Sequence, residues 1–220
     1  MRKILIFLLC LSLLCPVYAQ AERYVALTFD DGPSGRFTRE LLDGLRNRQV
    51  SATFLLCGYR IQEYPELAQR IYAEGHEIGL HGFSHENMAK MTQQQVQKEL
   101  SDTLKLLPAG CKPAFLRPPG GNCSPEVTAA AKAFGIGILH WSVDPRDWAS
   151  EDALMIQNTV VRTVRDGDVI LLHDMSASSV EAALAIVDEL HSQGFTFVTA
   201  SQLAQLRGIS IHPGSVYLRF

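Results

Sequence analysis

Residues 24–32 read Tyr-Val-Ala-Leu-Thr-Phe-Asp-Asp-Gly, a mostly apolar, β-prone run that ends in two adjacent carboxylates and a glycine. A short apolar run closed by such a turn signal is typical of a buried strand. Successive side chains of a strand alternate between its faces, so we expect Asp30 and Asp31 to point in different directions. The stretch predicts a strand that presents two acidic groups, with separate roles, at its carboxyl end.

The same pattern of an apolar run and then an amphipathic stretch repeats along the chain, which predicts strand–helix units around a mostly parallel sheet. With 220 residues, 47% of them hydrophobic, the chain suits one sizeable core and is short for two enzyme domains. Seven units favour an α/β fold of the distorted seven-stranded (β/α) barrel type, as a single domain, over an open doubly wound sheet. The expected strands are 24–29, 52–57, 77–80, 114–116, 136–143, 168–172 and 196–198.

Hydroxyl residues mark where helices between these strands are expected to begin. The expected starts are Thr92 with Gln95 as a capping box, Ser124 before Pro125, Ser150 before two acidic residues, and Ser178 with Glu181. Gly135 and Gly194 are expected to end two of the helices, because glycine tolerates the left-handed backbone that often follows a helix.

The amino terminus has the pattern of a secretory leader. Two cations precede an apolar run over 4–14, and Val17-Tyr18-Ala19 offers a small-residue cleavage site. The pattern predicts a signal peptide over 1–19 and the folded domain over 20–220, hence a secreted or cell-envelope protein.

A membrane anchor is a weaker interpretation, because the apolar run is shorter than the ~20 residues needed to cross a bilayer. A lipid anchor at Cys15 is a minor alternative, since Leu14 stands where a small residue is expected. The formal net charge of −3 argues against a nucleic-acid partner. No protein partner is predicted.

The segment after the leader holds three cysteines, Cys57, Cys111 and Cys123. In an oxidising compartment, Cys111 and Cys123 are the plausible pair, because they flank one short strand and its turn. Three unpaired thiols remain the alternative. The spacing includes no C-x-x-C pair and does not suit a structural zinc site.

Polar and titratable groups follow five of the seven expected strands. Each cluster alone is compatible with an ordinary turn, an exposed arginine or a core histidine. In a parallel architecture the clusters converge, because every return helix leaves these loops on one face. Their coincidence predicts an active site there. The clusters are 28–32, 81–85, 117–121, 144–148 and 173–174.

A metal site is predicted from His81 and His85, whose spacing of four lets both rings aim at one point in a helical turn. The third ligand is expected to be an oxygen of Asp30 or Asp31. Two histidines and one carboxylate leave positions open for water and substrate, which is typical of a catalytic rather than a structural site. Zinc is the first expectation.

The carboxylate that does not bind metal is a candidate general base, which Arg117 would keep ionised and oriented. His173, from the opposite side, is a candidate proton donor to a leaving group. Trp148 follows a strand end and is expected to wall a sugar or acetyl pocket. Among the other histidines, His76, His191 and His212 are expected to be exposed.

With these residues assembled, the chain resembles the polysaccharide deacetylases, the NodB-homology group of carbohydrate esterases that includes chitin, peptidoglycan and acetylxylan deacetylases. The resemblance spans about residues 24–206 and rests on an ordered set that is far more specific than any single motif. The motifs are Thr-Phe-Asp-Asp (28–31), His-x-x-x-His (81–85), Arg-x-Pro (117–119), Asp-x-x-Asp-Trp (144–148) and Leu-x-His (171–173).

The resemblance implies a division of labour at the site. It implies Asp31, His81 and His85 as ligands of a divalent metal, Zn²⁺ or Co²⁺. The other implied roles are Asp30 as general base beside Arg117, His173 as general acid beside Asp147, and Leu171 and Trp148 as walls of the acetyl pocket.

Two positions depart from the family pattern. Gly82 stands where Ser or Thr is usual, which removes one supporting hydrogen bond. Gly120 stands where Tyr is frequent, which removes an aromatic wall, although its backbone amide can still supply the oxyanion contact.

The expected function is metal-dependent removal of acetyl groups from a carbohydrate, most specifically N-deacetylation of N-acetylglucosamine in peptidoglycan or chitin-type oligomers. An O-acetyl esterase acting on xylan or a similar polysaccharide is the close alternative. A catalytically inactive carbohydrate-binding protein is the alternative of another class, but binding alone would not need a base, an acid and a metal together.

Overall fold

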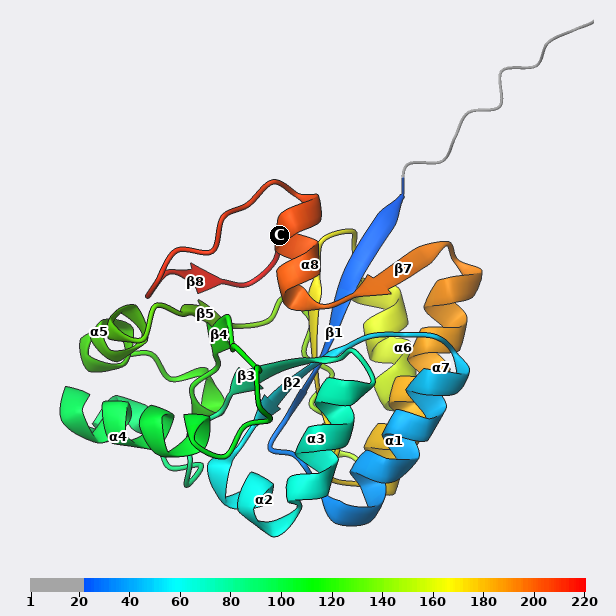
Figure 1. Cartoon of the computed structure of the whole chain (residues 1–220). Helices are drawn as coiled ribbons and strands as arrows, with labels where there is room; N and C mark the ends of the chain where they lie inside the picture. The colour runs from blue at the N-terminus through cyan, green and yellow to red at the C-terminus, as the bar shows by residue number, and fades with distance from the viewer. Residues whose placement is uncertain (1–21) are drawn as a thin grey trace, which may run out of the picture.

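The computed structural model of the chain describes residues 22–220, so the expected signal peptide over 1–19 lies outside the described residues. Strands meet at the centre and helices surround them (Figure 1). Within 22–220 the strands are β1 Arg23–Asp30, β2 Thr53–Leu56, β3 Glu77–Leu80, β4 Phe115–Leu116, β5 Gly137–Leu139, β6 Val169–His173, β7 Phe195–Val198 and β8 Val216–Tyr217.

The strands form one curled parallel sheet in the order β6-β1-β2-β3-β4-β5-β8, with β7 also paired to β1. The chain beyond β5 brings the two ends of the sheet together. Val143 forms a parallel bridge with Ile170 of β6, and the Leu171 amide donates to the Val143 carbonyl at 2.9 Å. The predicted fold class, a distorted seven-stranded α/β barrel, is confirmed, with a short eighth strand added.

Two of the four predicted helix starts are confirmed. Thr92 and Gln95 form the expected capping box at α4, and the Ser124 hydroxyl caps α5. Two predicted starts were wrong: Asp152, rather than Ser150, caps α6, and Ser176, rather than Ser178, caps α7. The helices are α1 Gly35–Asn47, α2 Gly58–Glu63, α3 Pro65–Ala73, α4 Gln93–Leu104, α5 Pro125–Ala133, α6 Ala153–Thr163, α7 Ala177–Ser192 and α8 Ala200–Leu206.

Three short 3₁₀ segments stand in the loops: η1 (Met88–Lys90), η2 (Pro119–Gly121) and η3 (Asp147–Ala149). Gly135 and Gly194 follow α5 and α7 with φ of 72° and 82°, as expected for glycines that end helices.

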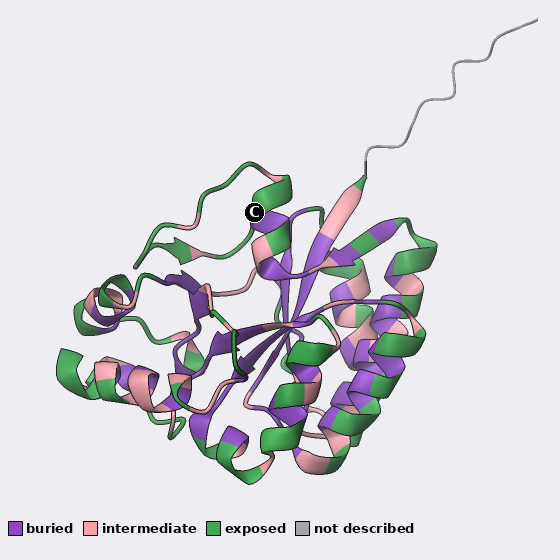
Figure 2. Ribbon diagram, in the orientation of Figure 1, coloured by how far each residue is buried: buried purple, intermediate pink, exposed green. Residues whose placement is uncertain are grey.

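The strands are buried throughout the centre of the molecule, and the helices turn one face toward them (Figure 2). Burial fixes the register, because a slip of one residue would move every apolar side chain of a strand to its other face. In the observed register Asp30, at the end of β1, lies beside His173, at the end of β6. The register thereby brings two of the five predicted clusters together.

The strand predicted over 136–143 is too long, because β5 ends at Leu139. The following residues leave β5, remain partly buried and turn across the barrel opening toward β6, which they meet through the single bridge from Val143 to Ile170. The carboxyl terminus closes the space between β5 and β6 at the opposite end of the barrel. There β8 pairs with β5, Arg219 bridges Asp168 just before β6, and the Tyr217 and Phe220 rings stack at 5.4 Å.

The expected pair of Cys111 and Cys123 is not formed, and the alternative of unpaired thiols holds, since all three cysteines within 22–220 are free. Burial and the nearby Glu77 carboxylate, at the start of β3, raise the pKa of the Cys111 thiol to about 11. Cys123 instead lies beyond the carboxyl end of β4, 3.8 Å from the Thr128 hydroxyl. The two thiols therefore belong to opposite ends of the sheet.

Two further findings concern His76 and the lengths of the helices. His76, expected to be exposed, is buried, and its Nδ1 accepts a hydrogen bond from the Ala52 amide at 3.1 Å. No helix within 22–220 combines the length and the apolar character needed to span a membrane.

Candidate active site

Three predicted metal ligands converge at the carboxyl end of the sheet. Asp31 Oδ1 lies 3.1 Å from His81 Nε2 and 3.0 Å from His85 Nε2. Asp31 and His85 both adopt the left-handed backbone, with φ of 71° and 63°, which is uncommon for residues other than glycine. Such strain concentrates where a structure holds side chains for a function.

A hydrogen bond fixes the orientation of the His81 ring. Its Nδ1 lies 2.7 Å from the Arg117 carbonyl oxygen, which can only accept, so Nδ1 carries the proton and Nε2 keeps its lone pair. The free nitrogen is the one that faces Asp31. This is the arrangement in which a histidine binds a metal.

The three groups fit a divalent cation. Asp31 Oδ1 is buried and has no hydrogen-bond partner within the described residues, although two ring nitrogens lie near it. Burial alone would raise the pKa of the Asp31 carboxyl, but the neighbouring His81 and His85 rings lower it well below its ordinary value. A carboxylate and two imidazole nitrogens form a donor set suited to zinc or a similar ion.

The second carboxylate, Asp30, has a different environment. Arg117 is fully buried, and its Nη1 donates to Asp30 Oδ1 at 2.6 Å and to the Thr28 hydroxyl at 2.9 Å. Asp30 Oδ2 remains 3.9 Å from His81 Nε2, at the edge of the candidate metal centre. The sequence left the choice between the two aspartates open, and the structure places Asp31 rather than Asp30 with both histidines.

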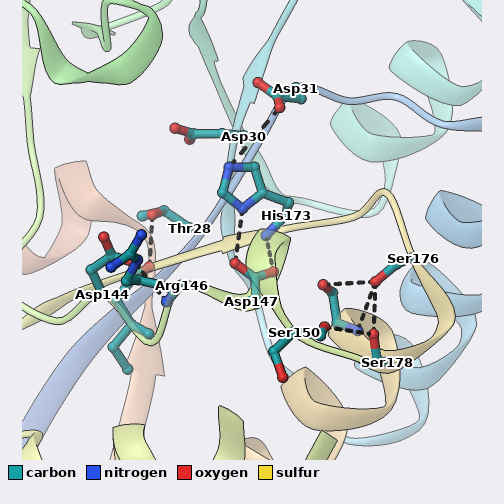
Figure 3. Close-up of polar contacts among 12 residues, drawn as sticks. Thr28, Asp30, Asp31, Asp144, Arg146, Asp147, Ser150, His173, Ser176 and Ser178 are labelled. Atoms are coloured by element: carbon teal, nitrogen blue, oxygen red, sulfur yellow. Dashed lines mark hydrogen bonds and ion pairs between the residues drawn. The ribbon is translucent and has the colours of Figure 1, made fainter. Parts of the chain in front are cut away.

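His173 lies on the other side of the centre and is held by Asp147. The Asp147 carboxylate accepts from the His173 amide at 2.8 Å and lies 2.9 Å from its Nδ1 (Figure 3). Nε2 therefore faces the site, 4.0 Å from Asp31. Burial alone would lower the pKa of His173, but the Asp147 hydrogen bond and charge, with the charges of Asp30 and Asp31, raise it to about 9.

A pocket of about 400 Å³, termed the acetyl pocket after the role expected of its walls, opens directly over these groups. Trp148 and Leu171, which are expected to wall it, and Gly120, which is expected to supply the oxyanion contact, all line it. Asp144, which belongs to the predicted 144–148 cluster but was given no role of its own, also lines it, as does Trp141, which lies in the strand predicted over 136–143 and was not recognised as a site residue.

The loop between the two histidines receives support that the sequence did not reveal. The Glu99 carboxylate of α4 accepts hydrogen bonds from the Phe83 amide at 2.7 Å and from the Ser84 amide at 2.8 Å. Gly82 itself has a φ of 80°, where a side chain would be strained and would collide with Met88. A carboxylate from another helix thus supports the loop despite the glycine at the family's Ser or Thr position.

A second unexpected carboxylate, Asp174, lies fully buried directly after His173. It accepts a hydrogen bond from the Thr38 hydroxyl, and its side chain packs against Gly32, beside Asp31. Burial raises the pKa of this carboxyl to about 6. The sequence marked this residue as part of a cluster but assigned it no role.

The fold and the site together define an enzyme whose candidate metal centre lies between an Arg-paired carboxylate and an Asp-paired histidine. The polysaccharide deacetylase family model matches residues 18–139, and the chain belongs to this family. The resemblance found in the sequence is confirmed, and the chain is a hydrolase that acts as a polysaccharide deacetylase.

Named relatives agree with this assignment. A peptidoglycan-N-acetylglucosamine deacetylase of Bacillus cereus is 39% identical over 84% of this chain and 90% of its own length. The peptidoglycan-N-acetylmuramic acid deacetylase PdaC of Bacillus subtilis is 35% identical over 84% of this chain, and the match covers 40% of the length of PdaC. A family 4 acetyl xylan esterase of Clostridium thermocellum, solved with a cobalt ion, superposes with a TM-score of 0.84 and 35% identity, covering 90% of this chain and 98% of the other.

Proposed function

We propose that this chain removes N-acetyl groups from a polysaccharide that contains N-acetylglucosamine, of the peptidoglycan or chitin type. The observation that carries the proposal is the separation of roles around one point. Asp31 faces two imidazole nitrogens, Asp30 is paired with a buried arginine, and His173 is paired with Asp147.

Asp31, His81 and His85 are the proposed metal ligands. A divalent cation held by them, zinc by first expectation and cobalt as an alternative, would supply a Lewis acid that activates water and polarises the acetyl carbonyl. Asp30, fixed by Arg117, takes the proton of the attacking water. The Gly120 amide is proposed to stabilise the oxyanion that develops on the acetyl oxygen.

His173 then completes the reaction by giving a proton to the departing amine nitrogen. A raised pKa of about 9 keeps its ring protonated at neutral pH, as a general acid requires. Its Nδ1 is committed to Asp147, which directs the Nε2 proton toward the site. The apolar wall made by Leu171 and Trp148 suits the acetyl methyl group.

Acetate release by purified, zinc-loaded protein tests this proposal. The substrates are N-acetylglucosamine oligomers, peptidoglycan and acetylated xylan, and the matched variant is Asp30→Asn, which retains the size of the side chain. We expect release from the amide-linked substrates and a loss of about 10²-fold or more in the variant. Equal rates in the two proteins would overturn the role of Asp30.

A second candidate function, O-acetyl ester hydrolysis, is favoured by the similarity to the acetyl xylan esterase. The same residues would serve, since an alkoxide leaving group also benefits from a proton donor. Faster release from acetylated xylan than from the amino-sugar oligomers would select this alternative. Tight glycan binding without acetate release in added zinc or cobalt would instead revive the inactive carbohydrate-binding alternative.

We also propose that the protein acts outside the cytoplasm, in the secreted or cell-envelope fraction. The support is the leader pattern over 1–19. Amino-terminal sequencing of the protein recovered from cells tests it. A first residue near Gln20 is expected, a lipid-modified Cys15 would indicate anchoring, and an intact Met1 would contradict export by cleavage.

A further inference from the structure

A second pocket, of about 430 Å³, opens beside His173 on the side that faces the start of α7. Its volume falls in the range of ~300–1,000 Å³ that ligand sites occupy. Asp31, Trp148 and His173 line both this pocket and the acetyl pocket, so the two adjoin at the candidate metal centre. We term it the serine pocket, defined by Ser150, Glu151, Met175, Ser176 and Ser178.

The hydroxyl groups of the serine pocket are held in place. Ser176 Oγ accepts from the Ser179 amide at 3.1 Å and lies 3.0 Å from Ser178 Oγ, which in turn donates to the Ser150 carbonyl at 3.3 Å. Figure 3 shows this group apart from Asp144, with the His173 and Asp147 pair between them. Fixed hydroxyls beside an exposed tryptophan suit a sugar, which offers hydroxyls at its rim and C–H groups on its faces.

Three carboxylates line the serine pocket, and one of them, Glu151, has no partner that compensates its charge. Asp31 faces the candidate metal ligands and Asp147 pairs with His173, whereas Glu151 is exposed and forms no ion pair or hydrogen bond with the rest of 22–220. Arg146 is the one lysine or arginine of the segment between β5 and α6. Its guanidinium carbon lies 5.3 Å from the centroid of the Trp148 ring. No lysine or arginine of the described chain lines either pocket.

We propose that the serine pocket binds the neighbouring sugar of the glycan chain and that Glu151 favours an uncharged or cationic sugar there over one that carries a carboxylate. An anionic sugar would bring its charge against Glu151, and no lysine or arginine lines the pocket to offset that repulsion. This inference rests on the proposed function and narrows its substrate. Chains made only of N-acetylglucosamine are preferred over chains that alternate with lactyl-bearing muramic acid.

The test compares two tetrasaccharides by kcat/KM for acetate release. One contains only N-acetylglucosamine, and the other is a peptide-free strand that alternates N-acetylglucosamine with N-acetylmuramic acid and so carries free carboxylates. Wild type is expected to favour the uncharged chain. Glu151→Gln is expected to narrow the preference about threefold, the size that a single solvent-screened charge supports, and high salt should narrow it in wild type.

Glu181→Gln is the matched control, because Glu181 is exposed on α7 but does not line the serine pocket. A second variant, Ser178→Ala, tests sugar binding itself. It is expected to reduce the ratio of kcat/KM for the uncharged tetrasaccharide to kcat/KM for N-acetylglucosamine. An unchanged ratio in Glu151→Gln, an equal effect of Glu181→Gln, or an unchanged chain-length preference in Ser178→Ala would overturn the inference. Absence of acetate release from both tetrasaccharides would instead count against the proposed function.

Discussion

The guanidinium of Arg117 binds four acceptors at once in a fully buried position, and its replacement by lysine should destabilise the fold. Nε donates to the Leu139 carbonyl at 2.9 Å and Nη2 to the His140 carbonyl at 2.8 Å. Nη1 donates to Asp30 and to the Thr28 hydroxyl. A lysine ammonium retains the charge but lacks the planar fork that reaches the carbonyls and the carboxylate together.

The expected loss follows from the acceptors that lysine leaves unpaired. The Leu139 and His140 carbonyls, one buried and one partly buried, would each lose a donor at a cost of about 1–3 kcal/mol, so Arg117→Lys should lower the free energy of unfolding by about 4 kcal/mol. For a chain of this size, 1 kcal/mol corresponds to about 2–4 °C, which places the Tm about 12 °C below wild type. Thermal unfolding followed by circular dichroism measures it.

Arg36→Lys provides the matched control for this substitution. Arg36 forms an exposed helical pair with Glu40 at 2.7 Å, and such pairs contribute about 0.3–0.5 kcal/mol. The control should change the Tm by less than about 2 °C. The reasoning fails if Arg117→Lys melts within this margin, or if the two variants lose equal stability.

Three further predictions concern the acid, a buried histidine and the carboxyl terminus. Asp147→Asn removes the partner that raises the pKa of His173. The pH above which kcat falls should therefore be about 1–3 units lower than in wild type. Burial lowers the pKa of His76 to about 4, so the unfolded chain takes up this proton first. The free energy of unfolding should therefore fall by about 3 kcal/mol as the pH drops from about 6.5 to about 4, and His76→Asn, which can keep an acceptor for the Ala52 amide, should remove this dependence. Deletion of residues 209–220 should lower the Tm by about 10 °C or more, since it removes β8 and the rings that close the barrel.

Each of these predictions has an outcome that counts against it. An unmoved high-pH limb in Asp147→Asn would show that His173 is not the titrating acid. A pH dependence of stability that persists in His76→Asn would assign it to other groups. A truncated chain whose Tm equals that of wild type would show that β8 contributes nothing to the closure of the barrel.

The sequence predicted the fold wherever burial and pairing coincide. β3 begins and ends at its predicted residues, 77 and 80, because a short apolar run there fills a fully paired strand. The run at 136–143 misled, because its second half leaves β5, crosses the barrel opening and meets β6 through one bridge at Val143. β8 was not predicted, since the apolar run at 216–218 is shorter than the runs that indicate a buried strand, and the strand itself has two residues.

The sequence located the site better than it located the support of the site. Spacing within a loop predicted His81 and His85, and adjacency predicted that Asp30 and Asp31 would differ. No local pattern identified Glu99, and the predicted 173–174 cluster included Asp174 without a role, because each carboxylate acts on a loop distant in the chain. Such contacts depend on how α4, β1 and β6 are placed relative to one another, which only the folded chain determines.

Metal content measured on three purified proteins, alongside acetate release, tests the central claim most directly. Wild type and Asp30→Asn should each hold one divalent ion per chain, Asp31→Ala should hold none, and both variants should lose turnover. Metal retained in Asp31→Ala, or lost equally from both variants, would contradict the assignment of one aspartate to the cation and its neighbour to the proton.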